Sequence, residues 1–171
     1  MISQFKYISF PKNLQEIRSI LPDIDYLPNR HKILPFDKNL KEKLEYILKS
    51  KYTISSVLYF RLLSKSVGFI HIDKDLNNPS TAPNLALNLP ILNGNIAMMY
   101  WYKQKENTYP IYFPGPSKKT ATPMLYNNDA ICVNKTLMDK PTIVKVNDWH
   151  SISNISDNEP CEVLSIRFIG K

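Results

Sequence analysis

The chain has 171 residues, of which 43% are hydrophobic and 22% charged. This composition is typical of a globular protein and excludes a disordered or collagen-like chain, and the length suits one domain with its own core. The net charge of +7 permits attraction to anionic partners. Because the lysines are scattered rather than gathered with aromatic residues, a dedicated nucleic-acid surface is possible but not favoured.

The sequence lacks the signals of several classes of protein. No apolar run of 18 residues is present, and MISQFKYISF lacks the basic and apolar regions of a signal peptide. We therefore expect no membrane span and a location in the cytoplasm of a bacterium or a phage-infected host. Cys132 and Cys161 are far apart in apolar runs, which predicts buried free thiols rather than a disulfide. Zinc-ligand spacings, glycine-rich phosphate loops and GxSxG motifs are absent from the sequence.

The first 50 residues predict a short helical region. Apolar residues recur at helical spacing between Pro11 and Pro22, and again after Asp37, with lysine and glutamate on the outer face of the second set. The two sets are Leu14, Ile17, Ile20 and Leu21, and Leu40, Leu44, Ile47 and Leu48.

From residue 52 onward the pattern changes to strands separated by turn residues. We predict strands over 52–63, 67–73, 84–92, 96–103, 129–133, 142–146, 150–155 and 162–169. Asn93-Gly94 predicts a tight hairpin, since both residues tolerate positive φ. Residues 105–123, with prolines at 110, 114, 116 and 123, predict a long stiff insertion that forms a lid or substrate wall. Such regular strands indicate a β sandwich or barrel, here within a single domain over 1–171.

Three residues form a candidate metal site. His71 and Asp73 are alternate residues of a predicted strand, so their side chains are expected on one face. With a distant histidine they give the two imidazoles and one carboxylate that hold Fe(II) in non-haem oxygenases. His150, which opens a predicted strand at the expected mouth of the barrel, is the candidate third ligand, whereas His31 lies in an expected loop and is given no role. The alternative stays open that each histidine is an ordinary structural residue.

Arg167 is the second informative feature, because it lies in the otherwise apolar run 163–169. An unpaired guanidinium buried there would cost several kcal/mol. Three explanations remain: a nearby carboxylate pairs with it, an anionic ligand docks on its planar fork, or it is an edge-strand arginine that reaches water. Ser165, two residues earlier on the same face, would donate a hydroxyl to the same anion.

In order along the chain, His71-x-Asp73, His150 and Arg167 resemble the Fe(II)- and 2-oxoglutarate-dependent oxygenases with a double-stranded β-helix (jelly-roll) core. The phrases at 86–90, 149–154 and 164–167 (ALNLP, WHSISN and LSIR) look most like small phage and bacterial members near the aspartyl/asparaginyl hydroxylase branch. Asp73 is a departure, since that branch often lacks the carboxylate ligand. The resemblance implies a mainly β fold, with a jelly-roll core over 52–169 after a helical part over 1–50.

The resemblance also implies a role for each candidate residue. His71, Asp73 and His150 would hold Fe(II). The co-substrate 2-oxoglutarate would chelate that iron and place its C5-carboxylate on Arg167, with Ser165 assisting. O2 would then convert 2-oxoglutarate to succinate while an unidentified prime substrate, either a protein side chain or a small metabolite, is hydroxylated.

Other residues are candidates for the pocket, and other functions fit the same sequence. Asn88 is expected to contact the co-substrate from a strand neighbouring that of His71, and strand aromatics are candidates for the pocket wall, although such aromatics more often belong to a core. These aromatics are Tyr59, Tyr100, Trp101 and Tyr102. The alternative functions are an oxygenase acting on nucleic acid, a cupin-like metal- or ligand-binding module, and a phage structural jelly roll without oxygenase activity.

Overall fold

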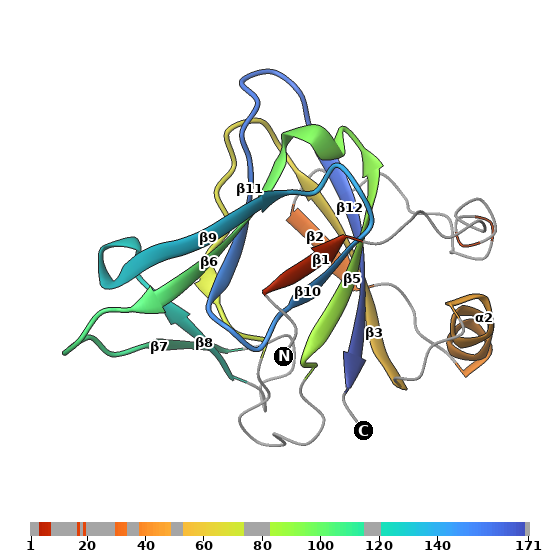
Figure 1. The fold of residues 1–171 in the computed structure, drawn as a ribbon, viewed down its shortest axis with the longest axis horizontal. Coiled ribbons are helices and arrows are strands. Elements are labelled where there is room, and N and C mark those ends of the chain that lie inside the picture. The colour runs from red at the N-terminus through yellow and green to blue at the C-terminus, as the bar shows by residue number, and fades with distance from the viewer. Residues whose placement is uncertain are drawn as a thin grey trace.

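The computed structural model describes residues 4–7, 17, 19, 30–33, 38–48, 53–73, 83–114 and 121–169. The protein is mainly β, as predicted, with two antiparallel six-stranded sheets (Figure 1). The elements are β1 (Phe5–Tyr7), β2 (Arg30–Ile33), α2 (Lys38–Leu48), β3 (Thr53–Leu62), β4 (Ile70–His71), β5 (Leu85–Leu92), η2 (Gly94–Ile96), β6 (Ala97–Gln104), β7 (Ile111–Pro114), β8 (Ala121–Leu125), η3 (Asn127–Asp129), β9 (Ala130–Leu137), β10 (Thr142–Lys145), β11 (His150–Asn154) and β12 (Cys161–Ile169). No helix within these ranges is long and apolar enough to cross a membrane.

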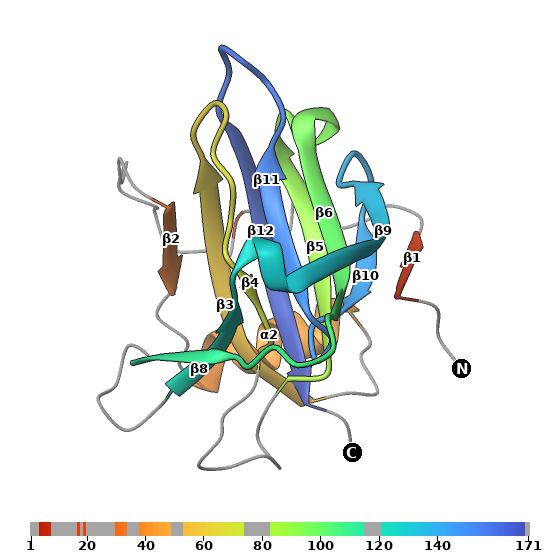
Figure 2. The same cartoon turned by 90° about the vertical axis from the view of Figure 1, so that its left-hand side faces the viewer.

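The strand order brings distant segments together. Sheet A has the order β1-β10-β5-β12-β3-β2, and sheet B has the order β7-β8-β4-β11-β6-β9. Successive strands alternate between the sheets from β3 to β6 and again from β9 to β12, so the two sheets lie face to face (Figure 2). As a result, β12 pairs with both β3 and β5, and β11 pairs with both β4 and β6.

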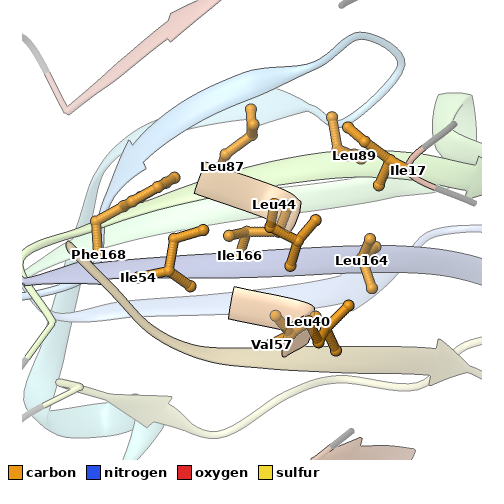
Figure 3. Packing of buried hydrophobic residues seen from close by; sticks show 10 residues of the cluster. All are labelled: Ile17, Leu40, Leu44, Ile54, Val57, Leu87, Leu89, Leu164, Ile166 and Phe168. Atoms are coloured by element: carbon orange, nitrogen blue, oxygen red, sulfur yellow. The ribbon is translucent and has the colours of Figure 1, made fainter. Parts of the chain in front are cut away.

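Helix α2 packs on the outer face of sheet A (Figure 3). Alternation along β12 places Leu164, Ile166 and Phe168 on the helix side, which leaves the odd-numbered residues to face sheet B. The buried cluster consists of Ile17, Leu40, Leu44, Ile54, Val57, Leu87, Leu89, Leu164, Ile166 and Phe168. Each such side chain contributes about 1.5–3 kcal/mol by leaving water, so this face is the main anchor of sheet A.

The helix predicted after Asp37 is therefore confirmed as α2. Of the helix predicted between Pro11 and Pro22, the described residues are Ile17 and Ser19, which are both helical; the remainder lies outside the described residues. A second cluster, which includes Met99, Trp101 and Val163, fills part of the space between the sheets.

The N-terminal part is not wholly helical, which corrects the prediction for 1–50. β1 pairs with β10 and β2 pairs with β3, so these two short strands form the two edges of sheet A. His31 accordingly lies in a strand rather than a loop. The physical reason is non-local: a sheet edge offers unpaired backbone groups that a passing segment of modest strand propensity can satisfy.

The segment 105–123 also differs from its prediction as a stiff insertion. It contributes β7 and most of β8, which pair with each other, and β8 in turn pairs with β4, so the segment widens sheet B. Residues 115–120 lie outside the described part. Asn93-Gly94 is a turn, but not a hairpin, because β5 and β6 belong to different sheets. Only Asn93 has positive φ there, at 49°.

The two cysteines are free, as predicted, but only Cys161 is buried. Cys132 is exposed because β9 is the last strand of sheet B and its first half extends beyond the part that other elements cover.

Candidate metal centre

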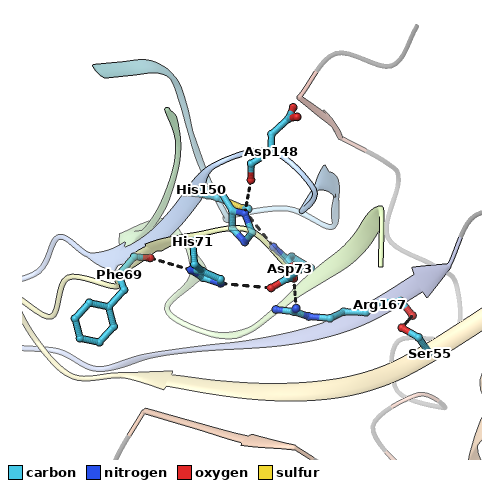
Figure 4. Close-up of polar contacts among 9 residues, drawn as sticks. Ser55, Phe69, His71, Asp73, Asp148, His150 and Arg167 are labelled. Carbon is cyan, nitrogen blue, oxygen red and sulfur yellow. Dashed lines mark hydrogen bonds and ion pairs between the residues drawn. The ribbon is translucent and has the colours of Figure 1, made fainter. Parts of the chain in front are cut away.

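His71, Asp73 and His150 lie together in the structure (Figure 4). One ligand atom from each residue can be chosen so that all lie within 4.8 Å of one another. The two histidines are directly opposed in the β4–β11 pair, and their ring centroids are 4.5 Å apart. Directly opposed residues of antiparallel strands point to the same face, so the sheet itself brings the two imidazoles side by side.

Asp73 reaches the site for a different reason from the one predicted. β4 ends at His71, so strand alternation does not orient Asp73. Instead, the chain leaves sheet B, and the Asp73 N–H donates to the Val146 carbonyl at 2.9 Å, directly after β10 of sheet A. An Asp73 oxygen then lies 3.4 Å from His71 Nε2. The carboxylate therefore sits at the junction of the two sheets.

Both imidazoles are oriented by the backbone. His71 Nδ1 lies 2.9 Å from the Phe69 carbonyl, and His150 Nδ1 lies 2.8 Å from the Asp148 carbonyl. A carbonyl only accepts, so Nδ1 carries the hydrogen in each ring and Nε2 keeps its lone pair. This arrangement is typical of metal-ligating histidines.

Burial keeps these rings neutral. It lowers the pKa of His71 to about 4, with the nearby Arg167 charge as a smaller cause. Burial and then the neighbouring His71 lower the pKa of His150 to about 3. Two neutral imidazoles and a carboxylate are a donor set that suits a divalent transition metal, so the residues present fit Fe(II). His150 is only 4% exposed, whereas the side chain of His71 is 27% exposed. Solvent therefore reaches the site beside His71, and the prediction that His150 lies at an open mouth of the barrel is wrong.

Arg167 forms an ion pair with Asp73 through Nη1. Of the three explanations left open by the sequence, the structure shows a carboxylate partner. The β3–β12 register shifts between Arg167 and Phe168, and Ser55, which the pairing skips, donates a hydrogen bond to the Arg167 carbonyl at 3.1 Å. Burial lowers the pKa of Arg167 to about 10, so the side chain is still charged at neutral pH. Its Nε is buried without a hydrogen-bond partner among the described residues, which leaves a donor for an anionic ligand.

Ser165 and Asn88 lie on the opposite wall of the same cavity. They are directly opposed in the β12–β5 pair, and both are buried. Asn88 was predicted on a strand next to that of His71. It lies instead on β5 of sheet A and lines the same cavity as His71 of sheet B. Its Nδ2 lies 3.6 Å and 3.7 Å from the sulfur atoms of Met99 and Met138, which are weak acceptors, so the amide is available to a better one.

The cavity contains about 370 Å³ not filled by protein atoms, part of it open to solvent. Sequence reasoning missed most of its apolar wall, although Phe60 follows the inward alternation of β3 and was recognisable on that basis. The lining residues are Phe60, His71, Asn88, Met99, Val146, His150, Ile152, Val163, Ser165 and Arg167.

The aromatic residues considered for the pocket wall lie elsewhere. Tyr59 packs with the cluster under α2. Tyr100 and Tyr102 are neighbours, and the Tyr102 hydroxyl bonds to Ser151, whose side chain points away from the cavity because it alternates with His150. Trp101 is fully buried, stacks on Phe5, and donates from Nε1 to the Lys145 carbonyl at 3.1 Å.

Comparison with known proteins gives no match to a sequence-family profile or to a curated protein. Among solved structures, HygX from Streptomyces hygroscopicus, determined with nickel and 2-oxoglutarate bound, is 10% identical, with a TM-score of 0.53. The match covers 99% of this chain and 84% of HygX. This chain has the fold of HygX.

Two further structures give weaker matches. An oxidoreductase of the 2OG-Fe(II) oxygenase family from Burkholderia pseudomallei is 11% identical, with a TM-score of 0.36 and a match covering 78% of this chain and 51% of that one. The epimerase SnoN, in complex with Fe3+, alpha ketoglutarate and nogalamycin RO, is 12% identical, with a TM-score of 0.42 and coverages of 76% and 54%. The chain thus spans about half the length of these two proteins.

The fold shared with HygX, which was determined with nickel and 2-oxoglutarate bound, agrees with the fold implied by the resemblance drawn from the sequence. At these identities the likeness to HygX shows the fold.

Proposed function

We propose that this protein is an Fe(II)- and 2-oxoglutarate-dependent oxygenase that hydroxylates a carbon centre of its substrate. The observation that carries the proposal is the convergence of His71, Asp73 and His150 beside Arg167 in one partly open cavity. The likeness to HygX, which holds nickel and 2-oxoglutarate, supports the same assignment.

The strand order supports the finer description of the fold. Strands β10-β5-β12-β3 of sheet A face β4-β11-β6-β9 of sheet B, and the chain crosses between the sheets at nearly every step. This connectivity supports a double-stranded β-helix, in which two four-stranded sheets form a jelly roll. We assign 52–169 to this core and the whole of 1–171 to a single domain.

The chain's own residues would bind the metal and orient the co-substrate. His71 and His150 offer Nε2 lone pairs, and Asp73 offers a carboxylate oxygen, so these three residues would hold the metal and leave it able to bind further ligands. When bound, Fe(II) supplies the reaction in which O2 oxidises 2-oxoglutarate to succinate and CO2 and delivers the second oxygen atom to the substrate.

Arg167 would bind the C5-carboxylate of 2-oxoglutarate. Its unpaired Nε and its Nη groups form the planar donor fork that matches a carboxylate. Binding would require Arg167 to exchange the Asp73 carboxylate for that of the co-substrate as Asp73 turns to the metal. Ser165, two residues before Arg167 and on the same face of β12, would add a hydroxyl donor, and Asn88 an amide donor. The apolar wall formed by residues such as Met99 and Val163 would exclude water from the reaction.

The test is anaerobic reconstitution with Fe(II) and 2-oxoglutarate, followed by measurement of the weak visible charge-transfer band and of O2-dependent succinate formation. His71→Ala should abolish both signals. Arg167→Ala should keep metal binding but raise the 2-oxoglutarate concentration needed for half-maximal turnover. Tyr46→Ala, at an 82% exposed position on α2, is the matched control and should behave as the wild type.

The outcomes separate the proposal from its alternatives. Full succinate formation by His71→Ala would overturn the metal assignment. Metal binding by the wild type without the charge-transfer band would favour a cupin-like binding module. A wild-type protein that binds no metal would favour a structural jelly roll.

A further inference from the structure

Two phenylalanine rings are stacked at the surface beside the candidate metal centre. Phe69 is 61% exposed and Phe113 is 49% exposed, although both are large apolar side chains. Their ring centroids are 6.4 Å apart, and the ring planes differ by only 23°. Neither ring belongs to the two buried clusters, so the pair contributes little to the core and presents apolar surface to solvent.

Strand register fixes this pair relative to the metal centre. His71 is opposite Met124 of β8, and Met124 is opposite Ile111 of β7. Because opposed residues share a face, Ile111 faces the same side of sheet B as His71, and so does Phe113 two residues later. β7 lies two strand spacings from β4, or ~10 Å.

Phe69 is tied to the same centre more directly. Its carbonyl accepts the hydrogen bond from His71 Nδ1 at 2.9 Å, and Figure 4 shows the Phe69 ring near His71. His71 is the more exposed of the two histidines, so the pair stands where a substrate would approach.

The charge of this surface restricts what it can bind. β4, β7 and β8 contain no Asp, Glu, Lys or Arg among their described residues. Asp73 and Arg167, at the metal centre, already neutralise each other. An ionic group placed on the two rings would find no counter-charge among the described residues of these three strands, whereas a flat uncharged ring would gain stacking contacts.

We propose that Phe69 and Phe113 form a platform that binds an uncharged aromatic ring of the prime substrate. A ring bound there would lie beside the metal centre, because Phe69 is two residues from His71 and its carbonyl accepts the hydrogen bond from His71 Nδ1. The inference rests on the proposed function only in assigning the ring to the prime substrate. The platform itself is a binding site that can be tested without turnover.

The experiment uses benzyl alcohol as the probe, with cyclohexylmethanol and benzylamine as matched non-aromatic and cationic probes. Saturation-transfer NMR on the full chain should show benzyl alcohol binding about tenfold more tightly than either matched probe. Phe69→Ala and Phe113→Ala should each weaken that binding about five- to tenfold, since each removes one stacking face. Phe113→Tyr keeps the face and should restore it, and Tyr46→Ala should leave it unchanged.

A second measurement locates the probe. Mn²⁺ added to the protein should broaden the ring protons of bound benzyl alcohol, and the His150→Ala variant should lose that broadening while it still binds the probe. The platform is refuted if binding is equal for the three probes, or is unchanged in both alanine variants. It is also refuted if bound ring protons are unaffected by Mn²⁺ that the protein demonstrably holds. A protein that binds benzyl alcohol at Phe69 and Phe113 but binds no Mn²⁺ would retain the platform and reject the proposed function.

Discussion

At the scale of single residues, the Asp73–Arg167 ion pair has the largest consequence. One carboxylate is both a candidate metal ligand and the partner of the guanidinium assigned to the co-substrate. Without metal, each residue neutralises a charge that would be costly to leave unpaired in a buried site. A metal ion and Arg167 therefore compete for Asp73, and metal binding should free Arg167 for an incoming dicarboxylate.

We expect Arg167→Met to bind divalent metal more tightly than the wild type, because it removes this competitor and leaves Asp73 as an unpaired carboxylate. An increase of about tenfold corresponds to ~1.4 kcal/mol, close to the lower end of what one charged hydrogen bond contributes. Titration calorimetry with Mn²⁺ measures the effect, and Arg167→Lys, which keeps the charge, should lie nearer the wild type. Weaker metal binding by Arg167→Met would show that the ion pair does not oppose the metal.

The two histidines predict how the stability of the metal-free protein depends on pH. An unfolded histidine has a pKa near 6.5, whereas burial lowers the pKa values of His71 and His150 to about 4 and about 3. The unfolded chain therefore binds more protons as the pH falls. Stability that is present above pH 6.5 is lost from there down toward pH 4, by up to roughly 1.4 kcal/mol per histidine per pH unit.

Thermal melts of the metal-free protein between pH 7.5 and pH 5 check this dependence. The melting temperature should fall with acidification, and His150→Gln, which removes one of the two titrating groups, should show a shallower slope whatever its absolute stability. Identical slopes for the two proteins would contradict the role given to burial of His150.

At the scale of elements, β4 is short and depends on close backbone approach. The Gly68 N–H donates to the Ile152 carbonyl at 2.9 Å, immediately before the strand that carries His71. A Cβ at Gly68 would lie 2.5 Å from that oxygen, so any side chain there would push β4 away from β11. Gly94, in the turn between β5 and β6, is equally confined, because a Cβ there would lie 2.4 Å from the Met138 carbonyl oxygen.

These two glycines provide a matched pair of variants. Gly68→Ala and Gly94→Ala should both destabilise the protein, each by about 1–3 kcal/mol, through backbone displacement. Only Gly68→Ala should also weaken Mn²⁺ binding, by tenfold or more, because it separates His71 from His150. Denaturant unfolding and metal titration of both variants give the comparison, and equal metal affinities would argue against β4 placement as the determinant of the site.

At the scale of the whole molecule, the candidate metal centre connects the two sheets. His71 and His150 belong to sheet B, Arg167 belongs to sheet A, and Asp73 lies where the chain passes between them. A metal ion held there with its co-substrate would add a bridge between the sheets that the unfolded chain does not have. Ligands that bind only the folded state stabilise it by mass action.

We therefore expect Mn²⁺ at 100 times its dissociation constant to stabilise the protein by about 2.7 kcal/mol, which raises the melting temperature by roughly 5–10 °C. Adding 2-oxoglutarate should raise it further, and chelation with EDTA should reverse both shifts. Differential scanning fluorimetry measures the change. The His150→Ala variant is the control, and a shift of the same size in that variant would show that the ion binds elsewhere.

Much of the core was predictable because its pattern is local. Alternation along 52–63 and 162–169 predicted β3 and β12, and apolar spacing after Asp37 predicted α2, since these periods follow from the geometry of one element. The same reasoning singled out His71, His150 and Arg167 as residues of unusual type for their strands. It also placed Asp73 beside His71, but it relied on the alternation of side chains along a strand. In the structure β4 ends at His71, and the hydrogen bond from the Asp73 N–H to the Val146 carbonyl positions Asp73 instead.

The sequence by itself determined which segments form the β core, that Ser165 and Arg167 share one face of β12, and which polar side chains had to be explained. Only the tertiary structure decided that β1 and β2 border sheet A, that β7 and β8 widen sheet B, and that Arg167 pairs with Asp73. These are contacts between segments far apart in the chain. They depend on which strand edges remain unpaired once the sheets have formed, and no local period records that.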